Sequence, residues 1–200
     1  MERILLVEPN YKNKYPPIGL MKISTYYKNK GDYVQFHKGL LSVAEVKTYD
    51  RVFITTLFTF DFDICVEAIR YYHAVIGCDN VFVGGIAATI MPERFETAIP
   101  GVRLLTGQLV SSDVLGYGDN INIDILDLDY DILWDIPYTY PAADSYFIYT
   151  SRGCPRKCPF CAVKSLEPVF YECENVREQI QRVDAQFGIK RNLLIMDNNA

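Results

Sequence analysis

Three cysteines close together in the last quarter of the chain have the residue type and spacing of metal ligands. Cys154, Cys158 and Cys161 are spaced C-x3-C-x2-C and directly follow the strand-like run 146–150. Thiolates are soft ligands that hold iron–sulfur clusters or zinc. Because three thiolates leave one metal position open, the spacing favours a cluster that takes part in chemistry over one that only braces a fold.

Structural zinc is the competing interpretation of these cysteines. Such zinc takes four protein ligands, usually from two C-x2–4-C pairs. The nearest fourth thiol is Cys173, twelve residues beyond the triplet, so a zinc-bearing interaction module would have an irregular spacing. Gly153, Pro155 and Pro159 suit a loop that wraps around a cluster. Phe160 would shield that cluster or stack on a planar ligand, so the sequence favours iron and sulfide while zinc stays open.

The composition of the chain excludes several classes of protein. The formal net charge is -5, from 20 basic and 25 acidic residues, which gives no basic footprint for nucleic acid. No apolar run reaches the roughly 20 residues of a membrane span. Glu8 and Pro9 interrupt the first apolar run too early for a signal peptide. We therefore expect a cytoplasmic protein, in which reduced cysteines bind metal rather than form disulfides.

Alternating strand-like and helix-like segments before the cysteines predict a doubly wound α/β parallel sheet. The expected strands are 4–7, 33–37, 51–56, 80–83 and 102–106, and the expected helices are 20–30, 62–76 and 91–98. In such sheets, ligands bind at the carboxyl ends of the strands. Thr55 and Thr56 lie at one such end, and Gly84 and Gly85 lie at another, where a missing Cβ lets a ligand approach. Neither a G-x-G-x-x-G motif nor a P-loop motif follows a strand, so a nicotinamide or nucleoside triphosphate site lacks its signature.

The chain divides into three segments on composition. Residues 1–108 form the α/β unit, and the acidic, proline-bearing stretch 109–144 predicts a solvated linker. Residues 145–200 predict the start of a second unit, with a strand at 146–150, a helix at 174–187 and a strand at 192–196. One β-loop-α-β unit cannot cover both faces of a parallel sheet. We therefore expect the N-terminal portion of a longer protein.

The stretch from Gly153 to Cys161 resembles the signature of the radical S-adenosylmethionine enzymes, C-x3-C-x-Φ-C with an aromatic residue at Φ. Its position after a strand is also similar. The N-terminal unit resembles the cobalamin-binding-like domain that precedes the radical core in one large subgroup, through residues 16–20 and 83–93. The resemblance implies a Rossmann-like, cobalamin-binding-like domain, followed by the first part of a (β/α) radical S-adenosylmethionine barrel.

The resemblance also implies what the cysteines do. Cys154, Cys158 and Cys161 would ligate three irons of a [4Fe-4S] cluster, and the fourth iron would bind S-adenosylmethionine. An electron donor such as flavodoxin or ferredoxin would allow reductive cleavage to a 5′-deoxyadenosyl radical. The radical would serve methylation, rearrangement or C–H functionalisation of a substrate that the sequence does not reveal. From these 200 residues alone we expect little or no catalysis.

Four further residues acquire cofactor roles from the resemblance. The backbone of Phe160 would lie near the adenine of S-adenosylmethionine. Asp197, Asn198 and Asn199 follow the strand at 192–196, where the family contacts the methionyl amine. The Gly-Gly-Glu form found in many members is absent here, so a polar strand-end turn remains an equal interpretation.

Cobalamin is the least supported of the implied cofactors. The D-x-H-x-x-G loop that supplies a histidine to cobalt is missing from residues 8–14. His37 and His73 fit ordinary, partly buried histidines better than cobalt ligands. Cobalamin held without a protein histidine would place its nucleotide tail in a slot lined by 55–56 and 84–85. An empty, vestigial domain, or a non-catalytic fragment that binds cobalamin or another small ligand, are the alternatives.

Overall fold

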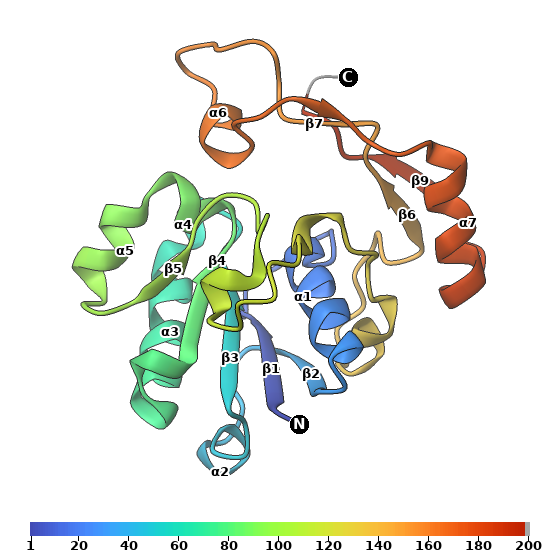
Figure 1. The fold of residues 1–200 in the computed structure, drawn as a ribbon. Coiled ribbons are helices and arrows are strands. Elements are labelled where there is room, and N and C mark those ends of the chain that lie inside the picture. The colour runs from blue at the N-terminus through green and yellow to red at the C-terminus, as the bar shows by residue number, and fades with distance from the viewer. Residues whose placement is uncertain (199–200) are drawn as a thin grey trace.

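A five-stranded parallel sheet forms the centre of the first unit in the computed structural model, which describes residues 1–198 (Figure 1). Its strands, in spatial order, are β2 (Tyr33–Lys38), β1 (Arg3–Glu8), β3 (Arg51–Thr55), β4 (Val81–Gly84) and β5 (Arg103–Leu105). Every neighbouring pair is parallel. The predicted α/β parallel sheet is confirmed, and its carboxyl edge is the edge at which open α/β sheets bind ligands.

Helices cover both faces of this sheet, as the doubly wound prediction requires. Alternate residues of β1 enter different cores, because strand side chains point to opposite faces. Ile4 and Leu6 pack with α1 (Ile18–Asn29), whereas Leu5 and Val7 pack with α3 (Phe62–Ile76). The remaining helices of the first unit are α2 (Val43–Val46), α4 (Ile86–Ile90) and α5 (Pro92–Ala98).

Helix α3 shows why the predicted helices form where they do. Cys65, Ile69 and Tyr72 are fully buried at helical spacing against the sheet. Gly77 ends the helix with a φ of 83°, a left-handed conformation that glycine tolerates. The prediction of one helix at 91–98 was incomplete, because the short α4 also begins after Gly85.

Residues 109–144 connect the two units, but they are not the solvated linker that the acidic composition predicts. They form three 3-10 turns, at Ser112–Leu115, Ile123–Ile125 and Tyr130–Trp134. Leu115, Ile123, Leu128, Tyr130, Ile132, Leu133, Ile136, Tyr140 and Ala142 are buried in the core that contains α1. The aspartates serve this packing: Asp129 accepts a hydrogen bond from the Asp131 amide at 3.1 Å and pairs with Lys28 of α1. The segment is therefore a structural layer of the first unit.

The second unit lies over the carboxyl ends of the first sheet (Figure 1). Strand β6 (Ser145–Ile148) pairs in parallel with β9 (Asn192–Ile195), and α7 (Val176–Phe187) connects them. Between β6 and α7, the strands β7 (Ser151–Arg152) and β8 (Tyr171–Glu172) form a small antiparallel pair that encloses α6 (Val163–Leu166). Across residues 1–198, no helix is long and apolar enough to cross a membrane.

Candidate functional site

The three predicted metal ligands lie in the loop between β7 and α6. Cys154, Cys158 and Cys161 are half-buried free thiols, and the Cys161 amide donates to the Cys158 carbonyl at 3.1 Å. Phe160 is 91% exposed at the outside of the loop. Within residues 1–198, no group of three or more His, Cys, Asp or Glu side chains is close enough together to hold a metal ion. The loop is therefore open, and the ligand role of its cysteines remains a prediction.

Two features of this loop fit a cluster nevertheless. Its donor set is made only of thiols, and the described structure leaves all three unpaired in disulfides. Gly153, which directly precedes the first cysteine, has a φ of 69°, and a Cβ there would lie 2.3 Å from the Val169 carbonyl oxygen. Only glycine permits this close passage of the two loop ends. The loop entrance is thus fixed by the backbone before any ligand is bound.

Asp197 lies at the end of β9, where the resemblance predicts a contact with S-adenosylmethionine. Its carboxylate accepts hydrogen bonds from the Thr150 amide at 2.8 Å and the Ser151 amide at 3.1 Å. Burial opposes ionisation, but hydrogen bonds from Thr150 and Ser151 outweigh it and hold the pKa of Asp197 below its ordinary value. The observed contacts join β9 to the β6–β7 junction. The role toward the cofactor remains a prediction.

The two asparagines after Asp197 have different outcomes. The Asn198 side-chain amide donates to Oε2 of Glu167 at 2.8 Å, so Asn198 reaches the far end of the cysteine loop. Asn199 lies outside the described residues. Cys173, the fourth thiol of the zinc interpretation, is half-buried just after β8, and burial raises its pKa.

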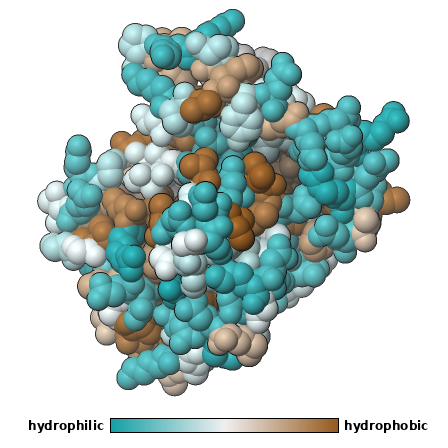
Figure 2. Space-filling view, in the orientation of Figure 1, coloured by the Kyte–Doolittle hydropathy of each residue, from teal (hydrophilic) through white to brown (hydrophobic). Residues whose placement is uncertain are grey.

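A cavity of about 490 Å³ separates the carboxyl edge of the first sheet from the second unit. The first unit contributes all four residues predicted to line a ligand slot, which are Thr55, Thr56, Gly84 and Gly85. The second unit contributes Tyr149, Arg152, Leu166, Glu167, Met196 and Asn198. Figure 2 shows apolar, brown residues gathered in the middle of the face that is drawn, below the second unit. The cavity is therefore shared between the predicted slot and the strand that leads into the cysteine loop.

The threonine and glycine pairs build the turn at this edge of the sheet. Gly85 has a φ of 106°, and a Cβ there would lie 2.3 Å from the Thr56 carbonyl oxygen. The Thr56 hydroxyl donates to the Gly84 carbonyl at 2.9 Å and accepts from the Ala88 amide at 3.0 Å. These contacts shape the cavity wall, whereas the predicted contact with cobalamin is a matter for experiment.

A buried ion network next to the cavity was not predicted from the sequence. The Arg152 guanidinium contacts Oε1 of Glu167 at 2.7 Å and Oδ2 of Asp124 at 3.0 Å. It also lies 4.2 Å from the centre of the Tyr149 ring. Burial raises the pKa of Tyr149 to about 12, so its hydroxyl stays protonated at neutral pH. Four side chains from three regions of the chain thus meet at the loop entrance.

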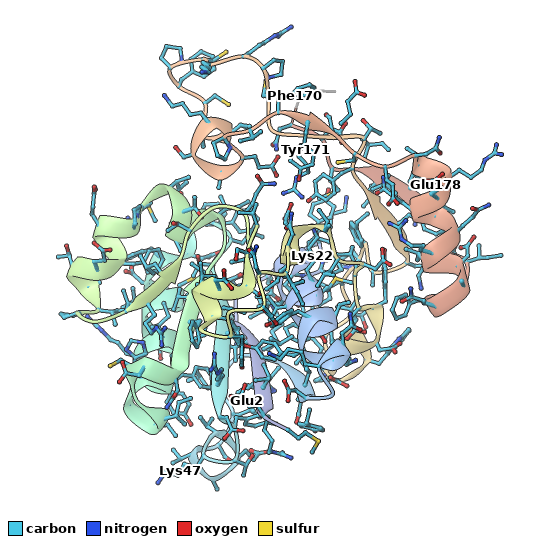
Figure 3. All side chains as sticks on the ribbon, in the orientation of Figure 1. Glu2, Lys22, Lys47, Phe170, Tyr171 and Glu178 are labelled. Carbon is cyan, nitrogen blue, oxygen red and sulfur yellow. The ribbon has the colours of Figure 1, made fainter. Side chains whose placement is uncertain are left out.

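Asp124 joins this network to the first unit. Nζ of Lys22 on α1 lies 3.3 Å from Oδ1 of Asp124, and the Gln108 side-chain amide donates to Oδ2 at 3.0 Å. The Tyr171 hydroxyl donates to the same Oδ2 at 3.4 Å. Figure 3 labels Lys22 on α1 and Tyr171 above it in the second unit. Burial lowers the pKa of Lys22, although Asp124 opposes the effect. These residues are far apart in sequence, so no local sequence pattern predicts their contact.

No family model and no curated protein sequence matches the chain. A solved structure with a similar fold is the radical S-adenosylmethionine methyltransferase TsrM from Kitasatospora setae, with tryptophan substrate and the S-adenosylmethionine analogue aza-SAM bound. The fold resembles that of a radical S-adenosylmethionine enzyme. The TM-score is 0.57 at 18% identity, over 99% of this chain and 48% of TsrM, so the chain spans about half of that protein.

Proposed function

We propose that this chain belongs to a radical S-adenosylmethionine enzyme, in which Cys154, Cys158 and Cys161 hold a [4Fe-4S] cluster. The observation that carries the proposal is a loop of three free thiols that follows a strand and whose two ends, at Arg152 and Glu167, line a cavity shared with a Rossmann-like unit. A cluster held by three thiolates would supply the electron for reductive cleavage of S-adenosylmethionine. The similarity of the fold to TsrM supports the same assignment.

The chain's own residues would bind and orient the cofactor at the loop. The backbone of Phe160 would lie near the adenine, and Asp197, Asn198 and Asn199 would contact the methionyl amine from the end of β9. Methylation, rearrangement and C–H functionalisation remain the candidate reactions, and the description of TsrM as a methyltransferase favours methyl transfer among them. A flavodoxin or ferredoxin would deliver the electron, in a reducing cytoplasm.

Metal analysis after anaerobic reconstitution tests the proposal. The wild-type chain should bind about four irons and a matching amount of sulfide. Alanine at Cys154, Cys158 or Cys161 should abolish that content, whereas serine at the exposed Cys78 should not change it. Zinc without iron, lost on Cys173→Ala, would instead establish the zinc module and refute the cluster.

A cobalamin or small-ligand site in the first unit is the second candidate, because the cavity has the four predicted slot residues in its wall. Among residues 1–198, neither His37 nor His73 lines that cavity. Any cobalamin bound there would therefore lack a ligand from either described histidine.

Cavity filling tests this second candidate. Ile86 of α4 lines the cavity, whereas Ile90 of the same helix does not. Wild type and Ile90→Trp should retain hydroxocobalamin through gel filtration, and Ile86→Trp should lose it. Failure of the wild type to retain the probe would remove cobalamin from the proposal and leave the cluster assignment untouched.

A further inference from the structure

One carboxylate joins the two ends of the cysteine loop. Glu167 follows α6 at the far end, and its Oε2 accepts a hydrogen bond from the Gly153 amide at 2.7 Å at the near end. Its Oε1 accepts from Nε of Arg152 at 2.9 Å. All three cysteines lie between these contacts. The loop is therefore closed at its base by Glu167, independently of any bound metal.

The same base is fixed to the first unit through a second carboxylate. Nη1 of Arg152 forms an ion pair with Oδ2 of Asp124, 3.0 Å away, in the segment 109–144. Asp124 is itself held by Lys22 of α1. The side chains of Arg152 and Glu167 are only 8% and 11% exposed. Since a buried charge that loses its partner is strongly destabilised, each member of this chain of contacts holds the next one in place.

A contact of a different kind provides the comparison. Asp127, three residues from Asp124, also bridges the segment 109–144 to the second unit, through Arg182 of α7 at 2.9 Å. This pair is about one-third exposed and lies on the helix rather than at the cysteine loop. Exposed pairs contribute little to stability. Asp127 therefore makes a contact between the units that does not reach the cysteine loop, whereas Asp124 makes one at the base of that loop.

We propose that Glu167, Arg152 and Asp124 form a clamp that positions the cluster-binding loop, with Asp124 acting as a positioning residue supplied by the first unit. The clamp depends on the proposed function only for what the loop binds. It gives the first unit a second role besides its cavity, because α1 and the segment 109–144 set the geometry of the cysteine loop. It also explains why four charged side chains are buried together beside the cavity.

The metal-free 200-residue chain tests the clamp by limited trypsin digestion. Arg156 and Lys157 are exposed inside the loop and offer cleavage sites. Glu167→Ala and Asp124→Asn should accelerate cleavage there by about tenfold, because local opening of the loop becomes easier. Asp127→Asn should stay within about twofold of wild type, as expected for an exposed pair. Equal cleavage of Asp124→Asn and Asp127→Asn would overturn the role of Asp124.

Electron paramagnetic resonance distinguishes an effect of Glu167 on the position of the loop from an effect on its stability. In the reconstituted chain, Glu167→Ala should change the g-values of the reduced cluster, and Glu167→Gln should restore them, because an amide oxygen still accepts the Gly153 hydrogen bond. The exposed Glu172→Gln is the matched control and should leave them unchanged. Unaltered g-values in Glu167→Ala would refute the clamp. If Glu167→Ala fails to fold, the digestion of Asp124→Asn decides: accelerated trypsin cleavage supports the clamp, and cleavage at the wild-type rate refutes it. If wild type takes up no cluster, the proposed function fails and the digestion alone decides the clamp.

Discussion

Among residues 1–198, the two parallel sheets are built from similar strands but differ in how evenly their strands are buried. In β1 of the first sheet, Ile4, Leu5, Leu6 and Val7 are all fully buried. In β9 of the second sheet, Leu193 and Ile195 are 47% and 45% exposed. The first sheet has helices on both faces, whereas the pair β6–β9 has α7 and a face that the described residues leave partly open.

The difference teaches where the second unit obtains its stability. A two-stranded sheet is marginal by itself. Tyr146, Phe147 and Ile148 of β6, with Val183 of α7, belong to the same buried cluster as α1 and the segment 109–144. The second unit thus shares a core with the first. We expect the first sheet to resist unfolding longest, and the cysteine-bearing unit to open at lower free energy.

The largest expected effect is a difference between the two parallel sheets in the free energy of unfolding that a substitution removes. Phe53 of β3 is fully buried and stacks on Phe82, with ring centres 4.9 Å apart. Phe53→Ala should lower the free energy of unfolding by about 3–5 kcal/mol. Leu193→Ala on the open strand should change it by less than about 0.5 kcal/mol, as for surface substitutions. Urea denaturation measures both, and similar losses would mean that the sheets are equally buried.

Two glycines sharpen the comparison at the level of backbone contacts. Gly85→Ala and Gly153→Ala both place a Cβ 2.3 Å from a carbonyl oxygen at positive φ. Gly85→Ala should cost about 1–3 kcal/mol of global stability, because its strain falls on the first sheet. Gly153→Ala should chiefly raise amide hydrogen exchange in the cysteine loop. Unchanged global stability in Gly85→Ala, or unchanged loop exchange in Gly153→Ala, would contradict the placement of these turns.

Acid should loosen the second unit at its strand ends. The folded pKa of Asp197 lies below its ordinary value, so the stability it contributes is present above the unfolded pKa of about 3.9 and is lost as pH falls through the folded pKa. Amide chemical shifts of Thr150 and Ser151 should therefore change below about pH 4. In Asp197→Asn that change should disappear; its persistence would assign it to another group.

The smallest expected effect concerns an exposed ion pair at the start of the second sheet. Arg191 lies 3.2 Å from Asp144, and its side chain is 89% exposed. Arg191→Ala should cost at most about 1 kcal/mol, and added salt should remove the difference from wild type. A larger, salt-resistant loss in thermal unfolding would show that this edge is more buried than the structure indicates.

Local patterns allowed much of the fold to be predicted. The aliphatic run 4–7 and the helical spacing of Cys65, Ile69 and Tyr72 carry their own signals, because each element buries a face set by its period. The segment 109–144 carries no such signal. An aspartate that caps a 3-10 turn, as Asp129 does, adds to the composition in the same way as an aspartate in a solvated linker. The buried residues of the segment follow no helical or strand period.

The candidate site divides in the same way. The cysteine triplet is local in sequence, so its spacing suggests a ligand role that stays a prediction, whereas Thr55, Thr56, Gly84 and Gly85 could be placed at a sheet edge. The clamp could not be predicted, because Lys22, Asp124, Arg152 and Glu167 meet only after the second unit has packed on the first. Long-range charge pairing requires the fold before it can be seen.

We propose above all that Cys154, Cys158 and Cys161 hold a cluster with an open iron that binds S-adenosylmethionine. Electron paramagnetic resonance of the reduced, reconstituted chain, recorded with and without S-adenosylmethionine, tests it most directly. We predict a [4Fe-4S] signal whose g-values shift when the cofactor is added, and which is absent in Cys158→Ala and retained in Cys78→Ser. A signal that ignores S-adenosylmethionine, or no iron–sulfur signal in the wild type, would contradict the account.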